Sequence, residues 1–320
     1  MGKILFIRGG AIGDFILTMP AIQLVRETLP EARIEVLGYD SITSVAKASS
    51  LVAATRSIEH GPMAGFFVPD GKLDSELMDY FGSFSVIISY LYDSAGFFRA
   101  NIERCKGGDF IQGPHVIDES KQEQCAALQL AKPLESLAMF LEKSYIELSL
   151  DNPEMTKPAL QSLGASTARP RIALHPGSGS ASKNWSLEGW VKVAAGLQEK
   201  FPIAEFLIIS GEAEERSIGD CLTMLDRAQV NYQHLAHAKL PEVAASLQRC
   251  DLFLGHDSGI SHLAAACALP ALLLFGPTEA KIWAPQNPAV RTIEADGGDL
   301  SKIQADAVVH QALEILSCDD

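Results

Sequence analysis

One stretch of this chain reads Asp251-Leu-Phe-Leu-Gly-His-Asp-Ser-Gly-Ile-Ser-His262-Leu-Ala-Ala-Ala266. Its apolar start, from Asp251 to Leu254, predicts a short strand, and the small residues after Gly259 predict a helix that carries His262 on its first turn. A helix that begins just past a strand, with no bulky side chain at its start, exposes unpaired backbone N–H groups at the positive end of the helix dipole. Anionic phosphates bind at such positions. We therefore expect this turn to hold the diphosphate of a nucleotide.

Strand and helix patterns alternate along the rest of the chain. The next strand, 271–275, ends in Gly276-Pro277-Thr278. Because strands separated by helices form parallel sheets, we expect an α/β protein with doubly wound parallel sheets. The other expected strands are 4–7, 33–37, 86–89, 171–175 and 205–209, and the other expected helices are 13–29, 187–200, 213–228, 240–248 and 301–316. Pro20, within the first helix, predicts a kink or an early break.

The length and the turn formers indicate two domains. A chain of 320 residues is usually two domains, and an apolar content of 47% is ample for two cores. Turn-forming residues gather between 151 and 170, so we place one domain at 1–160 and the other at 161–320. The last helix could pack back on the first domain.

Composition excludes several classes of protein. The net charge is −14, with 26 Lys and Arg against 40 Asp and Glu, and no cluster of basic residues suits a nucleic-acid partner. The six cysteines form no C-x-x-C pair, which argues against a zinc knuckle or a thioredoxin motif and favours reduced thiols in a cytosolic protein. No signal-peptide pattern opens the chain, and no apolar run approaches the 18 residues of a membrane span.

A glycine-rich turn follows the first strand and reads Arg8-Gly-Gly-Ala-Ile-Gly13-Asp14. It lacks the G-x-G-x-x-G of dinucleotide-binding turns and the Gly-Lys-Ser/Thr of a P-loop. Its carboxylate is unusual, since a phosphate-binding turn would avoid one. Asp14 either complements the dipole of the following helix or acts as a catalytic base, and spacing alone leaves both interpretations open.

Two loops of the second half carry charged residues close to the expected phosphate site. His175-Pro-Gly-Ser-Gly179 exposes backbone N–H groups and is followed by Lys183 and Trp185. Lys183 either binds phosphate or is a solvated lysine beside a core tryptophan. The loop from Gly211 to Glu215 holds three glutamates, which either hydrogen-bond sugar hydroxyls or complement the dipole of the helix they open.

Other patterns point away from metal and protease chemistry. His256, Asp257 and His262 match no zinc spacing, and Ser258 lacks the G-x-S-x-G context of a nucleophile elbow. No two aspartates stand at i and i+2, so the D-x-D metal clamp of many sugar-nucleotide enzymes is missing. The segment from Phe97 to Lys106 mixes aromatic and basic residues, typical of an amphipathic helix or of a surface for an anionic acceptor or a membrane.

Together these segments resemble family 9 glycosyltransferases, the ADP-heptose:lipopolysaccharide heptosyltransferases. The matching pieces, which extend over nearly the whole chain, are Gly-Asp14, His175-Pro-Gly-Ser-Gly with Lys183-x-Trp185, the Gly211 acidic loop, and Asp257-Ser-Gly-x-x-His262 followed by Phe275-Gly-Pro-Thr278. The resemblance implies a GT-B fold, in which two Rossmann-like domains face each other across a cleft. The N-terminal domain would bind the acceptor and the C-terminal domain the nucleotide sugar.

The resemblance also implies roles for single residues. Asp14 takes the place of the catalytic base and Lys183 that of the phosphate-binding lysine. Glu215 matches the acidic donor contact by loop position, with Glu212 and Glu214 as alternatives. The remaining residues expected to bind substrate or nucleotide are Gly13, Ser178, Gly179, Ala238, Lys239, Leu240, Asp257, Ser258, Gly259 and His262. This chain departs from the family pattern at Ser186, which follows Trp185, and at the Gly9-Gly10 pair, and the second departure lies on the acceptor side.

By this resemblance we expect an inverting, metal-independent transferase without a cofactor. It would move heptose from ADP-heptose to a lipid-linked oligosaccharide, the lipopolysaccharide core acceptor. We expect a cytoplasmic protein and leave open a peripheral contact with the cytoplasmic face of the inner membrane. The alternatives are a GT-B enzyme for another nucleotide sugar, an NAD-dependent enzyme, and a non-catalytic nucleotide-sugar binding protein.

Overall fold

Two α/β units make up the chain, one formed by residues 1–146 and the other by residues 147–320. The computed structural model describes residues 2–150, 152, 155 and 168–317. The Leu148 N–H donates to the carbonyl of Ala266 at 2.7 Å, and Gln248 Nε2 donates to the carbonyl of Leu148 at 3.2 Å. The chain is therefore bound to the second unit from this point. The boundary that the sequence placed between 160 and 161 lies outside the described residues.

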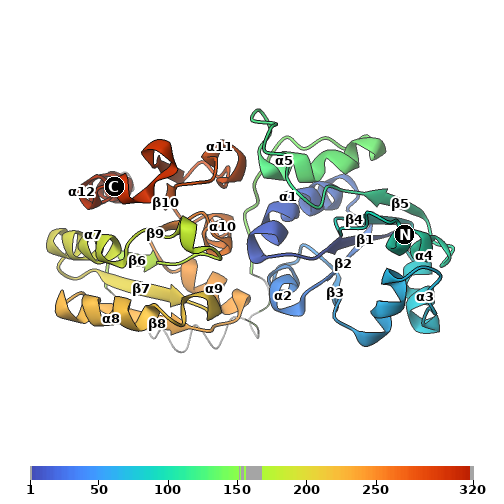
Figure 1. Cartoon of the computed structure of the whole chain (residues 1–320), viewed down its shortest axis with the longest axis horizontal. Coiled ribbons are helices and arrows are strands. Elements are labelled where there is room, and N and C mark those ends of the chain that lie inside the picture. The colour runs from blue at the N-terminus through green and yellow to red at the C-terminus, as the bar shows by residue number, and fades with distance from the viewer. Residues whose placement is uncertain (1, 151, 153–154, 156–167, 318–320) are drawn as a thin grey trace. The chain divides into compact units, whose positions relative to one another are not determined.

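The N-terminal unit is built on a five-stranded parallel sheet in the order β3-β2-β1-β4-β5 (Figure 1). Helices α3 and α4 cover one face, where Leu77, Phe81, Phe98 and Ile102 pack against strand residues. The strands are β1 Lys3–Arg8, β2 Arg33–Gly38, β3 Ala54–Ser57, β4 Val86–Ser89 and β5 Asp109–Gln112, and the helices are α1 Ile12–Thr28, α2 Asp40–Ala48, α3 Ser75–Gly82, α4 Phe97–Glu103 and α5 Ala126–Ala131.

Helix α1 runs unbroken through Pro20, so the predicted early break is wrong. A proline removes one backbone hydrogen bond from a helix interior. Here the helix buries an apolar face that includes Phe15, Met19, Ile22 and Val25. This burial offsets the lost bond, because tertiary packing supplies most of the stability of a helix in a folded protein.

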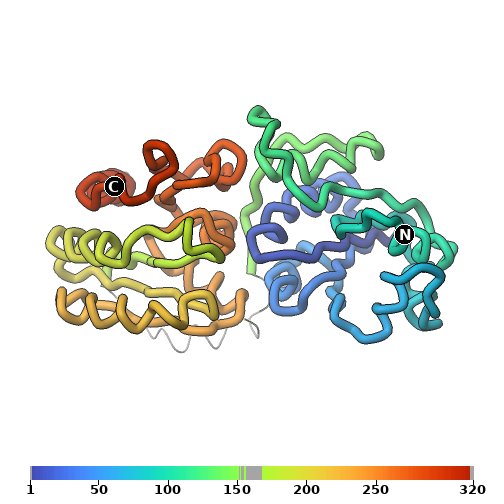
Figure 2. Tube along the Cα trace, viewed as in Figure 1, coloured from blue at the N-terminus to red at the C-terminus, as the bar shows by residue number. Residues whose placement is uncertain are grey.

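The C-terminal unit is built on a six-stranded parallel sheet in the order β11-β10-β9-β6-β7-β8. The elements are β6 Arg171–Leu174, α7 Leu187–Lys200, β7 Glu205–Ser210, α8 Ile218–Arg227, β8 Tyr232–Ala236, α9 Leu240–Leu247, β9 Leu252–His256, α10 Gly259–Ala266, β10 Ala271–Phe275, α11 Ala280–Trp283, β11 Val290–Glu294 and α12 Ala305–Ser317. In Figure 2 this unit runs from yellow-green α7 to red α12. The strands confirm the predicted parallel sheets.

Helices cover both faces of this second sheet. Helices α7, α8 and α12 share one core, with Trp190, Leu225 and Val308 packed on alternate residues of the central strands. Helices α9 and α10 pack on each other and belong to the opposite face, since their buried residues lie outside that core. Helix α12 packs against α7, so its apolar face is covered within its own unit.

The acidic loop after β7 differs from the prediction. A single helix was expected over 213–228, but a short turn, η4 (Glu212–Glu214), precedes α8, which begins at Ile218. The Glu214 side chain folds back to accept the Gly211 N–H at 2.8 Å. This bond closes a separate turn and delays the start of the helix.

Strand order places the functional loops at one edge of each sheet. In the C-terminal unit the chain runs outward from β6 through β7 to β8, and it then returns to β9 on the other side of β6. In the N-terminal unit the same reversal falls between β1 and β4. Ligands of open α/β sheets bind beyond the carboxyl ends of the strands at such switch points. Within the described part of the chain, no helix combines the length and apolar character needed to cross a bilayer.

Candidate functional site

The site of the C-terminal unit begins where β9 ends and α10 starts. Ser258 is the N-cap of α10, and its hydroxyl accepts the Ser261 N–H at 3.3 Å. The N–H groups of Gly259 and Ile260, which precede Ser261 in the first turn, have no acceptor within the helix. Asp257 and Ser258 are buried at 7% and 8% exposure, and His262 is buried on α10. The structure thus places Asp257, Ser258, Gly259 and His262 in one helix start, as expected for an anion site.

Lys183 lies at this helix start. Its Nζ is 2.6 Å from Asp257 Oδ2, and the Thr278 hydroxyl donates to the same oxygen at 2.9 Å. The lysine side chain is 30% exposed, whereas the aspartate side chain is 7% exposed. The ammonium is therefore fixed beside the first turn of α10, with part of its surface open to a ligand. The sequence assigned no role to Thr278, although it ends the Phe275-Gly-Pro-Thr278 segment. The structure shows that its hydroxyl binds the Asp257 carboxylate.

Hydrogen bonds of the Ser178 side chain shape the loop between β6 and α7. The buried Ser178 hydroxyl lies 2.8 Å from the Ser180 carbonyl and 2.7 Å from Asn184 Oδ1. The absence of a Cβ at Gly177 leaves room for the Glu214 side chain, which a Cβ there would displace. A Cβ on Gly179 would meet no atom within 4 Å, so nothing in the protein itself requires glycine at that position. Ser178 shapes the loop, while Gly179 leaves its outer surface open.

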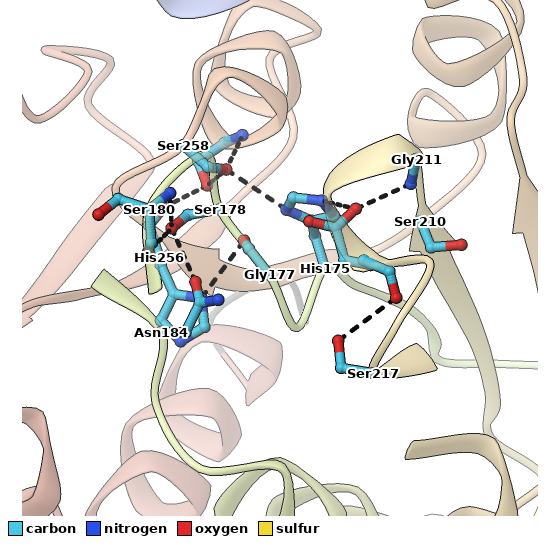
Figure 3. A network of polar contacts seen from close by, with 12 residues as sticks. His175, Gly177, Ser178, Ser180, Asn184, Ser210, Gly211, Ser217, His256 and Ser258 are labelled. Atoms are coloured by element: carbon cyan, nitrogen blue, oxygen red, sulfur yellow. Dashed lines mark hydrogen bonds and ion pairs between the residues drawn. The ribbon is translucent and has the colours of Figure 1, made fainter. Parts of the chain in front are cut away.

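His175 links the helix start to the acidic loop after β7, as Figure 3 shows. Its Nδ1 lies 3.4 Å from the Ser258 hydroxyl, and its Nε2 lies 3.6 Å from Glu214 Oε2. Burial acts to raise the pKa of Glu214, but His175 and the Gly211 N–H outweigh burial and lower that pKa below its usual value. Glu214 is 4% exposed, so its carboxylate contacts His175 and the Gly211 N–H rather than solvent.

The three glutamates of this loop, which were alternatives for the acidic donor contact, differ in exposure. Glu212 and Glu215 are exposed, and Glu215 Oε1 lies 3.8 Å from His237 Nε2 on the surface. Of the three glutamates of this loop, these two have carboxylates that face solvent. The loop 238–240, predicted to bind substrate or nucleotide, follows β8 at the same edge of the sheet: Lys239 is the exposed N-cap of α9, and Leu240 is buried.

His256, the last residue of β9, is fully buried. Its Nε2 accepts the Trp185 backbone N–H at 2.8 Å and the Trp190 indole N–H at 3.2 Å. Burial, with a smaller contribution from His175, lowers the pKa of His256 to about 3. From the sequence, His256 was a candidate only for a metal ligand. Its hydrogen bonds with Trp185 and Trp190 were not predicted.

Asp14 belongs to the N-terminal unit, in the first turn of α1. One oxygen accepts the Ala11 N–H at 3.0 Å, and the other lies 3.1 Å from Arg8 Nη2. Gly10 has a φ of +101°, and a Cβ there would lie 2.6 Å from Asp14 Oδ2. The turn Gly9–Gly13 therefore holds the carboxylate in a fixed position.

Arg8 is the residue of this site that sequence reasoning missed. Its side chain is 4% exposed, and it sits over the Tyr90 ring, with its guanidinium carbon 5.6 Å from the ring centre. Burial lowers the pKa of Arg8, and Asp14 acts in the opposite direction. An arginine directly before a Gly-Gly turn is the only signal that the sequence offered.

Helix α4 resolves the mixed aromatic and basic segment of the N-terminal unit. Phe98, Asn101 and Ile102 are buried, while Arg99 is exposed and pairs with Glu103 at 2.9 Å. The helix is amphipathic, and its exposed arginine already has an acidic partner. The segment therefore offers less positive charge than its sequence suggested.

Among the described residues, no group of three or more His, Cys, Asp or Glu is placed to hold a metal ion.

A cavity of the C-terminal unit lies apart from the predicted site residues. Its volume is about 590 Å³, it is lined by residues between 182 and 192 and between 298 and 305, and none of the predicted site residues lines it. We locate the site by its charges and its helix start rather than by this cavity.

Comparison with known proteins agrees with this geometry. A match to the family described as glycosyltransferase family 9 (heptosyltransferase) covers residues 85–310. The chain belongs to glycosyltransferase family 9. A curated relative, lipooligosaccharide heptosyltransferase 2 of Campylobacter jejuni, is 21% identical over 293 residues, which cover 89% of this chain and 84% of the relative.

Solved structures support the fold. The glycosyl transferase family 9 structure from Veillonella parvula has a TM-score of 0.80 at 16% identity and covers 99% of this chain and 97% of its own. The E. coli ADP-heptose lps heptosyltransferase II has a TM-score of 0.78 at 16% identity, with 99% of each chain covered. At this identity the likeness establishes the fold alone. The solved structures confirm the predicted GT-B class, and the family match confirms the family and the assignment as a glycosyltransferase that uses a nucleotide sugar.

Proposed function

We propose that this enzyme transfers heptose from ADP-heptose to a lipopolysaccharide core acceptor, with inversion and without a metal. Membership of a heptosyltransferase family and the names of the relatives support the sugar and the acceptor. The observation that carries the mechanism is the Lys183 ammonium, held by Asp257 beside the N-terminus of α10. A cation and free N–H groups at one point form a site for a diphosphate.

The departing ADP gains negative charge as the bond to the sugar breaks. In this proposal Lys183 and the N–H groups of Gly259 and Ile260 stabilise that charge. Loss of one such preorganised donor typically costs roughly 3–4 kcal/mol of transition-state stabilisation. Lysine and the helix dipole take the place of a metal ion, in line with the missing D-x-D motif. Glu215 or Glu212 would hydrogen-bond the sugar or the ribose.

Asp14 is the proposed general base. It removes the proton of the acceptor hydroxyl while that oxygen attacks the anomeric carbon, and the configuration inverts in this single displacement. Each carboxylate oxygen can accept two hydrogen bonds, so the contacts with Ala11 and Arg8 leave room for the acceptor hydroxyl. The side chain is 35% exposed, which leaves it accessible.

The acceptor in this proposal is a lipid-linked oligosaccharide, so the enzyme would work in the cytoplasm at the inner-membrane surface. Sedimentation with vesicles that contain anionic lipid tests the membrane contact. Binding that weakens with salt is expected, because anionic headgroups attract basic residues electrostatically. Absence of binding at low salt would refute the contact.

Two experiments test the proposal as a whole. In a thermal-shift comparison of ADP, UDP, GDP and NADH, we expect selective stabilisation by ADP, because a ligand stabilises only the state that binds it. Stabilisation by NADH or UDP instead would favour an NAD-dependent enzyme or another nucleotide-sugar donor. NMR of the product should show the inverted anomeric configuration, with a rate that EDTA leaves unchanged.

Asp14→Asn should lower kcat by about 10²–10⁴-fold while ADP binds as in wild type, since the base acts only in the chemical step. Asp40→Asn is the matched control, because Asp40, like Asp14, is an acidic residue in the first turn of a helix of the same unit. A wild-type rate in Asp14→Asn would refute the assignment of the base.

A further inference from the structure

We propose that His256 is a positioning residue that ties both ends of the Lys183 loop to the end of β9. The inference rests on the proposed function for what the loop binds, whereas all of its contacts lie within the C-terminal unit. His256 touches neither the donor nor the acceptor in this proposal. It acts through the backbone of the loop from Gly177 to Trp185.

The contacts of His256 fall at the two ends of that loop. Its Nε2 accepts the Trp185 N–H at 2.8 Å, and its Nδ1 lies 3.5 Å from the Gly177 carbonyl. Figure 3 shows His256 and Gly177 joined by the second of these contacts. The indole N–H of Trp190, on α7, donates to Nε2 as well, at 3.2 Å. One ring therefore anchors the beginning of the loop, its end and the helix that follows.

This arrangement requires one protonation state. A ring nitrogen that accepts two N–H donors carries no proton, so the proton of the neutral ring must sit on Nδ1, where it faces the Gly177 carbonyl. The ring is fully buried, and burial strongly favours its neutral form. His256 is therefore held as a single neutral tautomer.

The next residue completes the attachment. Asp257 binds the Lys183 ammonium at 2.6 Å, so two successive residues of one chain segment fix the loop backbone and its cation. A lysine side chain has high rotational freedom, and a fixed loop reduces the entropy lost when the ammonium meets a phosphate. The predicted effect of losing His256 is therefore weaker donor binding through a misplaced Lys183.

Two substitutions separate the hydrogen bonds from the packing. His256→Phe keeps an aromatic ring against Trp190, whose centre lies 5.1 Å from that of His256, but removes the acceptor. The buried N–H groups of Trp185 and Trp190 are then left without a partner, which the loop relieves by moving. His256→Gln supplies an oxygen for those donors and an amide N–H for the Gly177 carbonyl.

We expect His256→Phe to raise the Kd for ADP at least tenfold by calorimetry and to raise the donor KM more than it lowers kcat. His256→Gln should stay within about threefold of wild type. Because His256 acts through Lys183, adding His256→Phe to Lys183→Met should cause no further loss of ADP affinity. Additive losses, or equal losses in the Gln and Phe variants, would overturn the inference.

A spectroscopic test does not depend on the proposed function. Long-range ¹H–¹⁵N NMR of the donor-free protein should show His256 neutral with its proton on Nδ1, and a Trp190 indole proton whose shift changes in His256→Phe. A proton on Nε2 overturns the inference whatever the ADP result. If wild type failed to bind ADP while this signature was present, the proposed function would fail and the structural role of His256 would stand.

Folding of the variants is checked by circular dichroism. If His256→Phe does not fold, Trp190→Phe replaces it, because that change removes one of the two donors to Nε2 and leaves the Trp185 contact in place. We then expect an ADP Kd between those of wild type and Lys183→Met. An unchanged Kd in Trp190→Phe, or a Kd above that of Lys183→Met, would overturn the inference.

Discussion

Replacement of Lys183 by methionine tests the central charge of the proposed donor site. Methionine keeps an unbranched side chain of similar length but removes the ammonium. In the structure that ammonium lies 2.6 Å from Asp257 Oδ2, and the aspartate side chain is 7% exposed. The substitution therefore has two effects: a phosphate loses a charged donor, and a largely buried carboxylate next to the phosphate loses its neutralising partner.

The magnitude follows from these two effects. A hydrogen bond from a charged donor is worth about 1.5–3 kcal/mol. The Asp257 carboxylate, now without its ammonium partner, repels the diphosphate. We take this repulsion as only about 1 kcal/mol, because the Lys183 position is 30% exposed and solvent screens the charges. The sum is about 2.5–4 kcal/mol, which at 1.4 kcal/mol per factor of ten corresponds to a roughly 10²–10³-fold weaker Kd for ADP.

Isothermal calorimetry with ADP measures this loss, and a second substitution separates the two effects. Asp257→Asn in the Lys183→Met background removes the repulsion and should restore about fivefold of the affinity, while the Thr278 hydroxyl can still donate to the amide oxygen. Lys192→Met, at an exposed lysine of α7, is the control and should bind ADP as wild type. Unchanged affinity in Lys183→Met, or weaker binding when Asp257→Asn is added, would refute this account.

Three further predictions concern stability and the two glycine turns. The pKa of His256 is about 3 in the folded protein against an ordinary 6.5, so its contribution to stability is complete above pH 6.5 and is lost as the pH falls towards 3; at pH 5 the loss is about 2 kcal/mol, and urea unfolding of His256→Gln should lack that part of the pH dependence. Gly177→Ala would force Glu214 aside, and we expect weaker ADP binding and a Tm lower by at least 2 °C, whereas Gly179→Ala should leave the Tm unchanged. Gly10→Ala meets a positive φ and the Asp14 carboxylate, so we expect roughly 1–3 kcal/mol of lost stability and a lower kcat, with ADP binding retained.

Each of these predictions has a result that contradicts it. The same loss of stability between pH 6.5 and 5 in wild type and His256→Gln would assign the acid sensitivity to other groups. Equal Tm values for Gly177→Ala and Gly179→Ala would show that Glu214 does not require glycine at 177. A wild-type kcat in Gly10→Ala would mean that the turn does not fix Asp14 for catalysis.

Local patterns predicted much of the secondary structure and the general place of the site. The helix 187–200 and the strands 86–89 and 271–275 have the predicted bounds, because a run of apolar residues or a helical period is a property of neighbouring residues. The same patterns failed at Pro20, where burial of α1 outweighs the missing hydrogen bond, and after Gly211, where one side chain folds back on its own turn. Both failures come from contacts that a local period does not describe.

By itself the sequence determined that parallel strands alternate with helices, that a helix with a small-residue start follows β9, and that an acid and a lysine stand shortly after strands. Only the tertiary structure decided which of the glutamates is buried, that Arg8 pairs with Asp14, and that His256 binds the loop of Lys183. The Trp185–His256 bond joins residues 71 positions apart and exists because β6 and β9 are neighbours in the sheet. Strand order results from packing the whole unit, so no short segment of the chain contains it.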